Sequence, residues 1–179
     1  ASAADELFDR NGSMRPVWKP FINALANLSE DELRTKFERG RQYLRDAGVY
    51  FRQYSEDPLD EREWPLSNIP VLLHETEWAR ICNGLEQRAN LLESVMADLY
   101  GSGQLMTQGH LPPRLVTQNP HWKRPMVGIK PRGGHYLHFL AFEIGRSPDG
   151  SWIVLGDRTQ APSGAGFALE NRIAMRRVF

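Results

Sequence analysis

The sequence predicts an α+β protein in which N-terminal helices pack on a mainly antiparallel sheet. Three observations lead to this prediction. Apolar residues recur at three- and four-residue spacing through much of the first hundred residues, which is typical of helices. Residues 136–158 are rich in β-branched and aromatic side chains on either side of a turn sequence, which favours a hairpin. Because the helices come first and the strands follow, the two kinds of element are expected to form separate layers.

The N-terminal segment is predicted to hold two helices and a strand. A short helix is expected over residues 16–27. The next helix starts with a capping box, in which Ser29 is the N-cap and Glu32 occupies the third helical position. It is expected to end at Gly48, because glycine accepts the left-handed conformation that often follows a helix. Residues 49–54 have the composition of a strand.

The longest helix is predicted over residues 75–100, after a connector dense in acids and prolines in which Trp64 is the expected anchor. Arg88 is one of the polar residues on this helix and is expected to be a structural hydrogen-bond partner, with a ligand contact as the alternative. The other expected elements are a helix near residues 104–107, strands over 115–117 and 126–130, and a final helix from residue 167 toward 177.

Composition limits the possible classes of function. Lys plus Arg number 22, as do Asp plus Glu, so no overall charge favours nucleic acid or an anionic membrane. No apolar run approaches the roughly 20 residues that span a bilayer. The single cysteine, Cys82, excludes an intrachain disulfide. A cytoplasmic protein with neither nucleic-acid nor membrane partners is therefore expected.

The 179 residues suit a single piece with its own core. Its expected segments are residues 1–54 (helical start and strand), 55–70 (connector), 75–100 (long helix) and 115–179 (sheet and C-terminal helix).

The hairpin carries the candidate site. Residues 147–151 read Ser-Pro-Asp-Gly-Ser, in which proline presets one turn angle and glycine accepts a left-handed one. If the first and last residues of this turn lie opposite each other, Glu143 lies opposite Leu155. Side chains alternate along a strand, so Glu143, Asp157 and Thr159 would then share one face.

Two carboxylates on one face could hold a divalent cation. Diagonal neighbours on a hairpin are roughly 7–8 Å apart, and Mg²⁺ takes oxygen ligands at about 2.0–2.1 Å. Glu143 and Asp157 could therefore bridge one ion. The alternative is that the two acids face water or pair with Arg146 and Arg158.

A glycine-rich turn precedes the final helix. Ser163 and Gly164 lie where backbone N–H groups at a helix start can meet a phosphate. The turn matches neither a Walker loop nor a dinucleotide fingerprint. Behind it, Arg172 and Arg176 share a helix face, which is either a surface for an anion or a solvated basic face.

The chain resembles the circularly permuted ATP-grasp family, type 2, which is akin to glutathionylspermidine-synthase-like ligases. The resemblance covers nearly the whole chain, and its motifs occur in the expected order. They are NGSMRPVW (11–18), WPLSNIP (64–70), GLEQRA (84–89), DLYG (98–101), HYLH (135–138) and DRTQAPSGAGFALENR (157–172).

The resemblance implies a ligand set. ATP-grasp ligases hold Mg²⁺ with an acid on one strand and Glu-x-Asn on the next, positions that match Glu143, Asp157 and Thr159. Two of these depart from the pattern, because family members often carry aspartate at 143 and asparagine at 159. The resemblance also implies that Asn171 and Arg172 contact a phosphate or an acyl phosphate, with Lys130, Arg132, Ser163 and Gly164 as further nucleotide-binding candidates.

The implied reaction is ATP-dependent, Mg²⁺-requiring ligation of a carboxylate to an amine through an acyl phosphate, with small-molecule or peptide substrates. Family members are far longer, so the chain is expected to be an N-terminal fragment that is inactive by itself. The alternative is a pseudoenzyme or protein-interaction module that keeps the fold, which Thr159 favours. The identity of the substrates and the oligomeric state are left open.

Overall fold

The computed structural model describes residues 5–52 and 61–179. They form helices and short antiparallel strands, so the α+β class is confirmed. The strands form two separate two-stranded sheets in the described part of the chain, β1–β2 and β3–β4, where the sequence predicts one sheet. Contacts divide the chain into two compact units: unit 1, up to residue 74 together with residues 163–179, and unit 2, residues 75–162. That the 179 residues are one piece of a longer protein stays a prediction.

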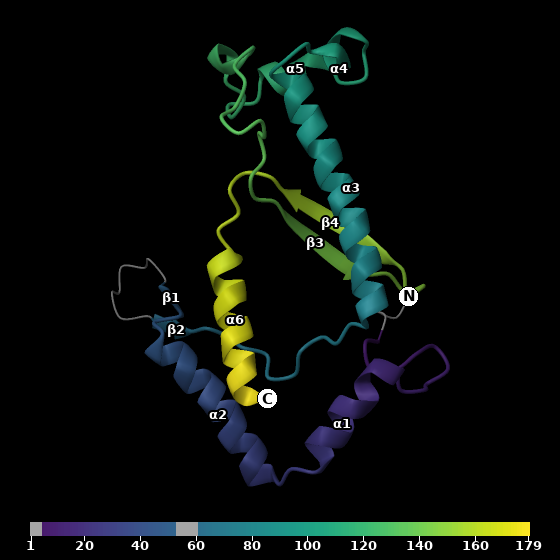
Figure 1. The fold of residues 1–179 in the computed structure, drawn as a ribbon, viewed down its shortest axis with the longest axis vertical. Coiled ribbons are helices and arrows are strands. Elements are labelled where there is room, and N and C mark those ends of the chain that lie inside the picture. Colours follow the sequence, from purple (N-terminus) through teal and green to yellow (C-terminus); the bar gives the residue numbers. More distant parts are fainter. Residues whose placement is uncertain (1–4, 53–60) are drawn as a thin grey trace. The chain divides into compact units, whose positions relative to one another are not determined.

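Each unit has its own helices and its own hairpin (Figure 1). Unit 1 contains η1 (Pro16–Trp18), α1 (Lys19–Ala26), α2 (Glu30–Asp46), β1 (Tyr50–Arg52), β2 (Glu61–Glu63) and α6 (Ala165–Val178). Unit 2 contains α3 (Glu75–Leu99), α4 (Gln104–Thr107), α5 (Pro113–Thr117), η2 (Arg124–Met126), β3 (Ala141–Arg146) and β4 (Trp152–Arg158).

Helix α2 begins and ends as the sequence predicts. The Ser29 hydroxyl accepts the Glu32 N–H at 3.3 Å, and the Glu32 carboxylate accepts the Ser29 N–H at 2.8 Å, which completes the capping box. After the helix, Gly48 has a φ of +70°, the left-handed conformation expected of a glycine there.

Helices α2 and α6 form the core of unit 1. Ala174 and Val178 of α6 are fully buried, and Leu44 of α2 is 3% exposed. A Cβ built on Gly40 would lie 2.6 Å from the Cγ2 atom of Val178. Only a residue without a side chain therefore allows α2 to approach α6 this closely at that point.

Trp64 is the anchor that the sequence predicts for the connector. Its ring stacks on that of Phe167 with centroids 4.4 Å apart, and its indole N–H donates to Asn171 Oδ1 at 2.7 Å. Beside this contact the Tyr43 hydroxyl donates to Glu170 at 2.7 Å. Aromatic stacking and two hydrogen bonds thus fasten α6 to the preceding elements of its unit.

The β3–β4 hairpin of unit 2 packs beside α3 (Figure 1). The side chain of Arg146 is 6% exposed and donates to Glu77 at 2.7 Å. The indole N–H of Trp152 donates to the same carboxylate oxygen at 2.9 Å, and the guanidinium of Arg146 lies 4.3 Å from the centre of that indole. An ion pair of a nearly buried arginine with a partly exposed glutamate, together with a cation–π contact, therefore holds the hairpin against the helix.

Three strand predictions are wrong. Residues 115–117 lie in the helix α5, and part of 126–130 lies in the 3₁₀ helix η2. Both helices carry proline in the first turn, which presets the helical φ there. Residues 136–140 are not in a strand either, since the backbone N–H groups of Tyr136 and Leu137 donate to the Glu93 carboxylate at 2.8 and 2.9 Å.

The predicted strand at 49–54 is present as β1, and its partner β2 lies in the expected connector, where the sequence predicts no strand. The predicted strand and the predicted connector (residues 55–70) both include residues from 53–60, which lie outside the described part of the chain.

Candidate functional site

The turn of the β3–β4 hairpin has the predicted form. Ser147 donates its N–H to the Ser151 carbonyl at 2.8 Å, and Gly150 donates to the Ser147 carbonyl at the same distance. Gly150 has a φ of +86°, which explains glycine at this position. Next to the turn the strands also pair as predicted, with Ile144 opposite Val154.

Beyond Ile144 the predicted register is wrong. A β-bulge leaves Leu155 of β4 without a directly opposite residue, so that Glu143 lies opposite Gly156 and Phe142 lies opposite Asp157. Directly opposite residues share a face of the sheet, and neighbours along a strand point to opposite faces. Glu143 and Asp157 therefore lie on opposite faces of the hairpin.

Each of the two acids has an arginine partner on its own face. Arg158 donates to Glu143 Oε1 from Nε at 2.8 Å and also from Nη2. Arg88 of α3 donates from Nε and Nη2 to the two oxygens of Asp157, both at 2.6 Å. The alternative pairing of an acid with Arg158 is thus confirmed for Glu143, and Arg88 is confirmed as a structural hydrogen-bond partner.

A shared magnesium site at Glu143, Asp157 and Thr159 does not fit this arrangement. The two carboxylates face away from each other, and Thr159 lies just beyond the end of β4. Among the described residues, no group of three or more His, Cys, Asp or Glu side chains is arranged to hold a metal ion. The geometric argument for one ion bridging both acids is therefore wrong, and a metal role for either acid alone stays a prediction.

The Asp157–Arg88 pair is charged at neutral pH. The hydrogen bonds from Arg88 hold the pKa of the Asp157 carboxyl below its ordinary value of 3.8, and the positive charge of Arg88 acts in the same direction against partial desolvation. The same hydrogen bonds raise the pKa of Arg88. The bidentate geometry fixes the orientation of β4 toward α3.

The other predicted site residues fall into two sets. Ser163, Gly164, Asn171 and Arg172 lie in unit 1 on or before α6, whereas Lys130 and Arg132 lie in a loop of unit 2 and are exposed. Of the first set, Arg172 is exposed and Asn171 is the half-buried acceptor for Trp64. Asn171 thus has a structural contact, and the catalytic roles of Asn171 and Arg172 stay predictions.

The start of α6 is open. Its N-cap residue, Gly164, has no side chain to cap the first turn, and a Cβ built on Gly164 or Gly166 would meet no described atom within 4 Å. The dipole at the start of a 14-residue helix favours an anion there. This geometry is compatible with the predicted phosphate contact at Ser163 and Gly164.

Sequence reasoning missed a groove between α3 and β4, with a volume of about 580 Å³. Its lining is mainly apolar, with polar groups from α3 at the rim. The lining residues are Arg80, Ile81, Gly84, Leu85, Gln87, Arg88, Leu91, Ile144, Trp152, Ile153 and Val154. The sequence carries no signal for this groove, because its shape depends on where the hairpin lies along the helix.

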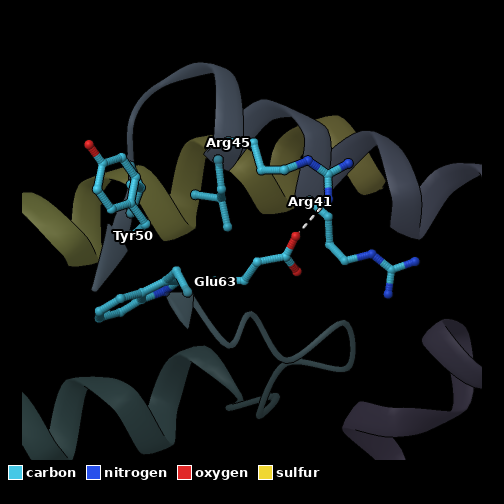
Figure 2. Close-up of a pocket in the computed structure, with 7 residues that line it drawn as sticks. Arg41, Arg45, Tyr50 and Glu63 are labelled. Carbon is cyan, nitrogen blue, oxygen red and sulfur yellow. Dashed lines mark hydrogen bonds and ion pairs between the residues drawn. The ribbon is translucent and has the colours of Figure 1, made fainter. Parts of the chain in front are cut away.

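A second cavity, of about 260 Å³, lies between α2 and the β1–β2 hairpin in unit 1. Figure 2 shows Arg41, Arg45, Tyr50 and Glu63 around it. Arg45 pairs with Glu63 and with Glu38, and Arg41 also pairs with Glu38. Each of the two arginines at the cavity is thus paired with at least one glutamate.

The comparisons with known proteins decide the family. The model of the family described as circularly permuted ATP-grasp type 2 matches residues 70–179. The chain belongs to this family. The matched region covers α3, the β3–β4 hairpin and α6.

Similar proteins occur in cyanobacteria and mycobacteria. The uncharacterized protein sll0335 of Synechocystis is 35% identical over 98% of this chain, and Rv2411c of Mycobacterium tuberculosis is 35% identical over all of it. A second M. tuberculosis protein, Rv2567, is 33% identical over 94% of the chain. The matched region is 36%, 32% and 20% of these three relatives, so the chain spans at most about one third of their length.

In the described ranges, none of the helices combines the length and apolar character that crossing a bilayer requires. A cytoplasmic location stays a prediction.

Proposed function

We propose that the longer protein to which this sequence corresponds is an ATP-dependent ligase that joins a carboxylate to an amine. The observation that carries the proposal is the family match over residues 70–179. ATP-grasp enzymes use ATP with Mg²⁺ to activate a carboxylate as an acyl phosphate, which an amine then attacks. The substrates are small molecules or peptides, and a specificity like that of glutathionylspermidine synthase is part of this proposal. The 179-residue chain by itself is expected to be inactive.

Within the chain, we assign the phosphate contact to the start of α6. Ser163 and Gly164 present backbone N–H groups in an open turn, and the helix dipole favours negative charge there. Arg172, exposed two turns further along the helix, adds a positive charge. These groups would bind and orient a phosphate, while Lys130 and Arg132 are weaker candidates for the same role.

Magnesium would neutralise the phosphates when it is bound with the nucleotide. No ligand set for the ion is assigned to this chain, because Glu143 and Asp157 point to opposite faces and each is held by an arginine. The requirement for Mg²⁺ is therefore proposed for the longer protein.

The test is a calorimetric titration of the longer protein with ATP in the presence of Mg²⁺. Gly164→Val adds a branched side chain where the fold has room but a phosphate would approach, so we expect it to weaken ATP binding by at least about tenfold, or 1.4 kcal/mol. Arg172→Ala should weaken binding less. Arg114→Ala removes another exposed arginine, from unit 2, and serves as the control of equal charge.

Two outcomes contradict the proposal. If wild-type protein shows no heat of ATP binding, the ligase function is excluded. If it binds ATP but Gly164→Val binds equally well, the phosphate lies elsewhere. Trapping of an acyl hydroxamate by hydroxylamine, in the presence of ATP and candidate carboxylates, would then identify the reaction class independently of α6.

The second candidate is a pseudoenzyme or protein-interaction module that keeps the fold. Two observations favour it: Thr159 stands where the family pattern has asparagine, and Asp157 is engaged with Arg88. This candidate predicts a longer protein that binds a partner protein but neither binds ATP nor yields a hydroxamate.

A further inference from the structure

The groove between α3 and β4 is open although its lining is apolar. It has a volume of about 580 Å³, and both of its walls belong to unit 2. Leu91 on the helix wall is 63% exposed. Ile153 and Leu155, whose side chains point to the face of β4 that is turned away from α3, are 45% and 66% exposed. Large aliphatic side chains are thus exposed on the helix wall and on the outer face of β4.

The strand wall of this groove has an unpaired edge. Within the described part of the chain, β4 pairs only with β3, so the backbone N–H and C=O groups along its other edge have no strand partner. An exposed edge of a two-stranded sheet is a template for a further strand, and a hairpin of two strands is by itself only marginally stable. Main-chain groups of β4 and apolar side chains of α3 are therefore both available to one extended segment.

The shape and chemistry of the groove select the kind of segment. A volume of about 580 Å³ accommodates several apolar side chains. The polar groups at the rim are Arg80, Gln87 and Arg88, and Arg88 is already bonded to Asp157. An extended segment with alternating apolar residues fits such a site, because its backbone can pair with β4 while every second side chain enters the groove.

The length of the relatives points to the source of this segment. The chain corresponds to 36% of sll0335 and 32% of Rv2411c, so about two thirds of these proteins lie outside the matched region. The family match itself includes α3, β3 and β4. A strand from the same polypeptide is held at high effective concentration, whereas a separate partner is not.

We propose that the groove and the free edge of β4 receive an extended, apolar β-strand from the part of the longer polypeptide outside these 179 residues. The added strand makes β4 an interior strand and covers Leu91. The surface is an intramolecular docking site, and it does not depend on whether the longer protein has ligase activity.

Hydrogen–deuterium exchange tests the added strand. Amides of residues 152–158 are compared between the 179-residue chain and the polypeptide of full encoded length. In a two-stranded hairpin, amides on the outer edge of β4 are open to solvent, so a docked strand should slow their exchange by at least about tenfold in the longer polypeptide. Equal exchange rates in the two polypeptides would overturn the proposal.

Leu91→Asp tests the helix wall. Leu91 is exposed in the 179-residue chain, so there the substitution should change Tm by no more than about 1 °C, whereas in the longer polypeptide it buries a charge and should lower Tm by several degrees. Leu115→Asp, at a 60% exposed leucine of the same unit outside the groove, is the matched control.

Three results are inconsistent with the proposed occupant. The first is an equal loss of Tm from Leu91→Asp and Leu115→Asp in the longer polypeptide. A dimer of the 179-residue chain that Leu91→Asp dissociates would assign the groove to a second copy. If the full encoded polypeptide contains no further strand-forming segment, an added strand from the same polypeptide is excluded. Because none of these measurements involves ATP, they are independent of the test of the ligase function.

Discussion

The two helix contacts of this protein are built in different ways. In unit 1, α2 meets α6 through apolar residues and Gly40, and Ala174 and Val178 are fully buried. In unit 2, α3 meets the β3–β4 hairpin largely through charged groups, with Arg146 on Glu77 and Asp157 on Arg88. The apolar contact of unit 1 is therefore closed, whereas the contact that long polar side chains make in unit 2 leaves an open apolar groove beside them.

The largest effect should come from the ion pair of unit 2. Glu77→Ala leaves the nearly buried Arg146 without its carboxylate and removes the acceptor of the Trp152 N–H. Because the Glu77 side chain is itself 31% exposed, we expect the low end of the range for a broken buried pair, a loss of about 3 kcal/mol in the free energy of unfolding. Urea unfolding of the 179-residue chain measures it. The exposed Glu75, in the same helical turn, is the control, and an equal loss from Glu75→Ala would mean that the pair contributes nothing specific.

The next largest effect should come from the close approach in unit 1. Gly40→Ala places a Cβ 2.6 Å from Val178, so we expect a net loss of about 1–2 kcal/mol, since overpacking exceeds the gain in helix propensity. Gly84→Ala in α3 is the matched substitution, because its Cβ meets no described atom within 4 Å. It should stabilise the 179-residue chain by up to about 1 kcal/mol. Opposite signs for the two variants in urea unfolding support the comparison, and equal signs contradict it.

A smaller effect distinguishes the observed register from the predicted one. In a double-mutant cycle, Asp157→Asn and Arg88→Gln should be coupled, because the two side chains share two hydrogen bonds. Asp157→Asn and Glu143→Gln should be additive within the error of urea unfolding, since these acids lie on opposite faces. Strong coupling between Asp157→Asn and Glu143→Gln would mean that the two acids share a face of the hairpin. It would then support one Mg²⁺ ion bridging both acids.

The smallest effect concerns acid stability. Backbone hydrogen bonds, from Leu105 above all and also from Gln104, together with the Ser102 hydroxyl, lower the pKa of Asp98 from its ordinary value of 3.8. A lowered pKa in the folded state stabilises the fold above pH 3.8, and this contribution is lost as the pH falls through the folded-state pKa. We therefore expect Asp98→Asn to reduce the dependence of Tm on pH below 3.8, as scanning calorimetry would measure. An unchanged dependence would show that Asp98 is not perturbed.

The sequence predicted the features that local chemistry determines. Ser29 and Glu32 cap α2, and Gly48 follows its end. The turn at residues 147–151 has the hydrogen bonds expected from its proline and glycine. The short helix α4 also lies where it was expected. Each of these depends on interactions within a few residues, which is why periodicity and turn composition were sufficient.

The candidate site was predicted less well, because a tertiary feature decides it. Strict alternation placed Glu143 opposite Leu155, and the bulge at Leu155 moved every pairing beyond it by one residue. Gly156, which follows Leu155, is a sequence signal for the bulge that strict alternation ignores, because an isolated glycine in a strand often marks one. Likewise, Tyr136 and Leu137 have a strand-like composition, but their N–H groups donate to the Glu93 carboxylate of α3, across 43 and 44 residues of sequence.

Three polar contacts along α3 have a mechanical consequence. Glu77, Arg88 and Glu93 reach the hairpin turn region, the end of β4 and the segment before β3, respectively. Sixteen residues of helix separate the first from the last, about 24 Å at 1.5 Å per residue. With a single contact the hairpin could rotate about that point. Three contacts spread over this length fix both the direction and the position of the hairpin relative to α3. Helix α3 and the β3–β4 hairpin should therefore move together as one rigid unit. A displacement at one end of α3 would then be transmitted to the other end.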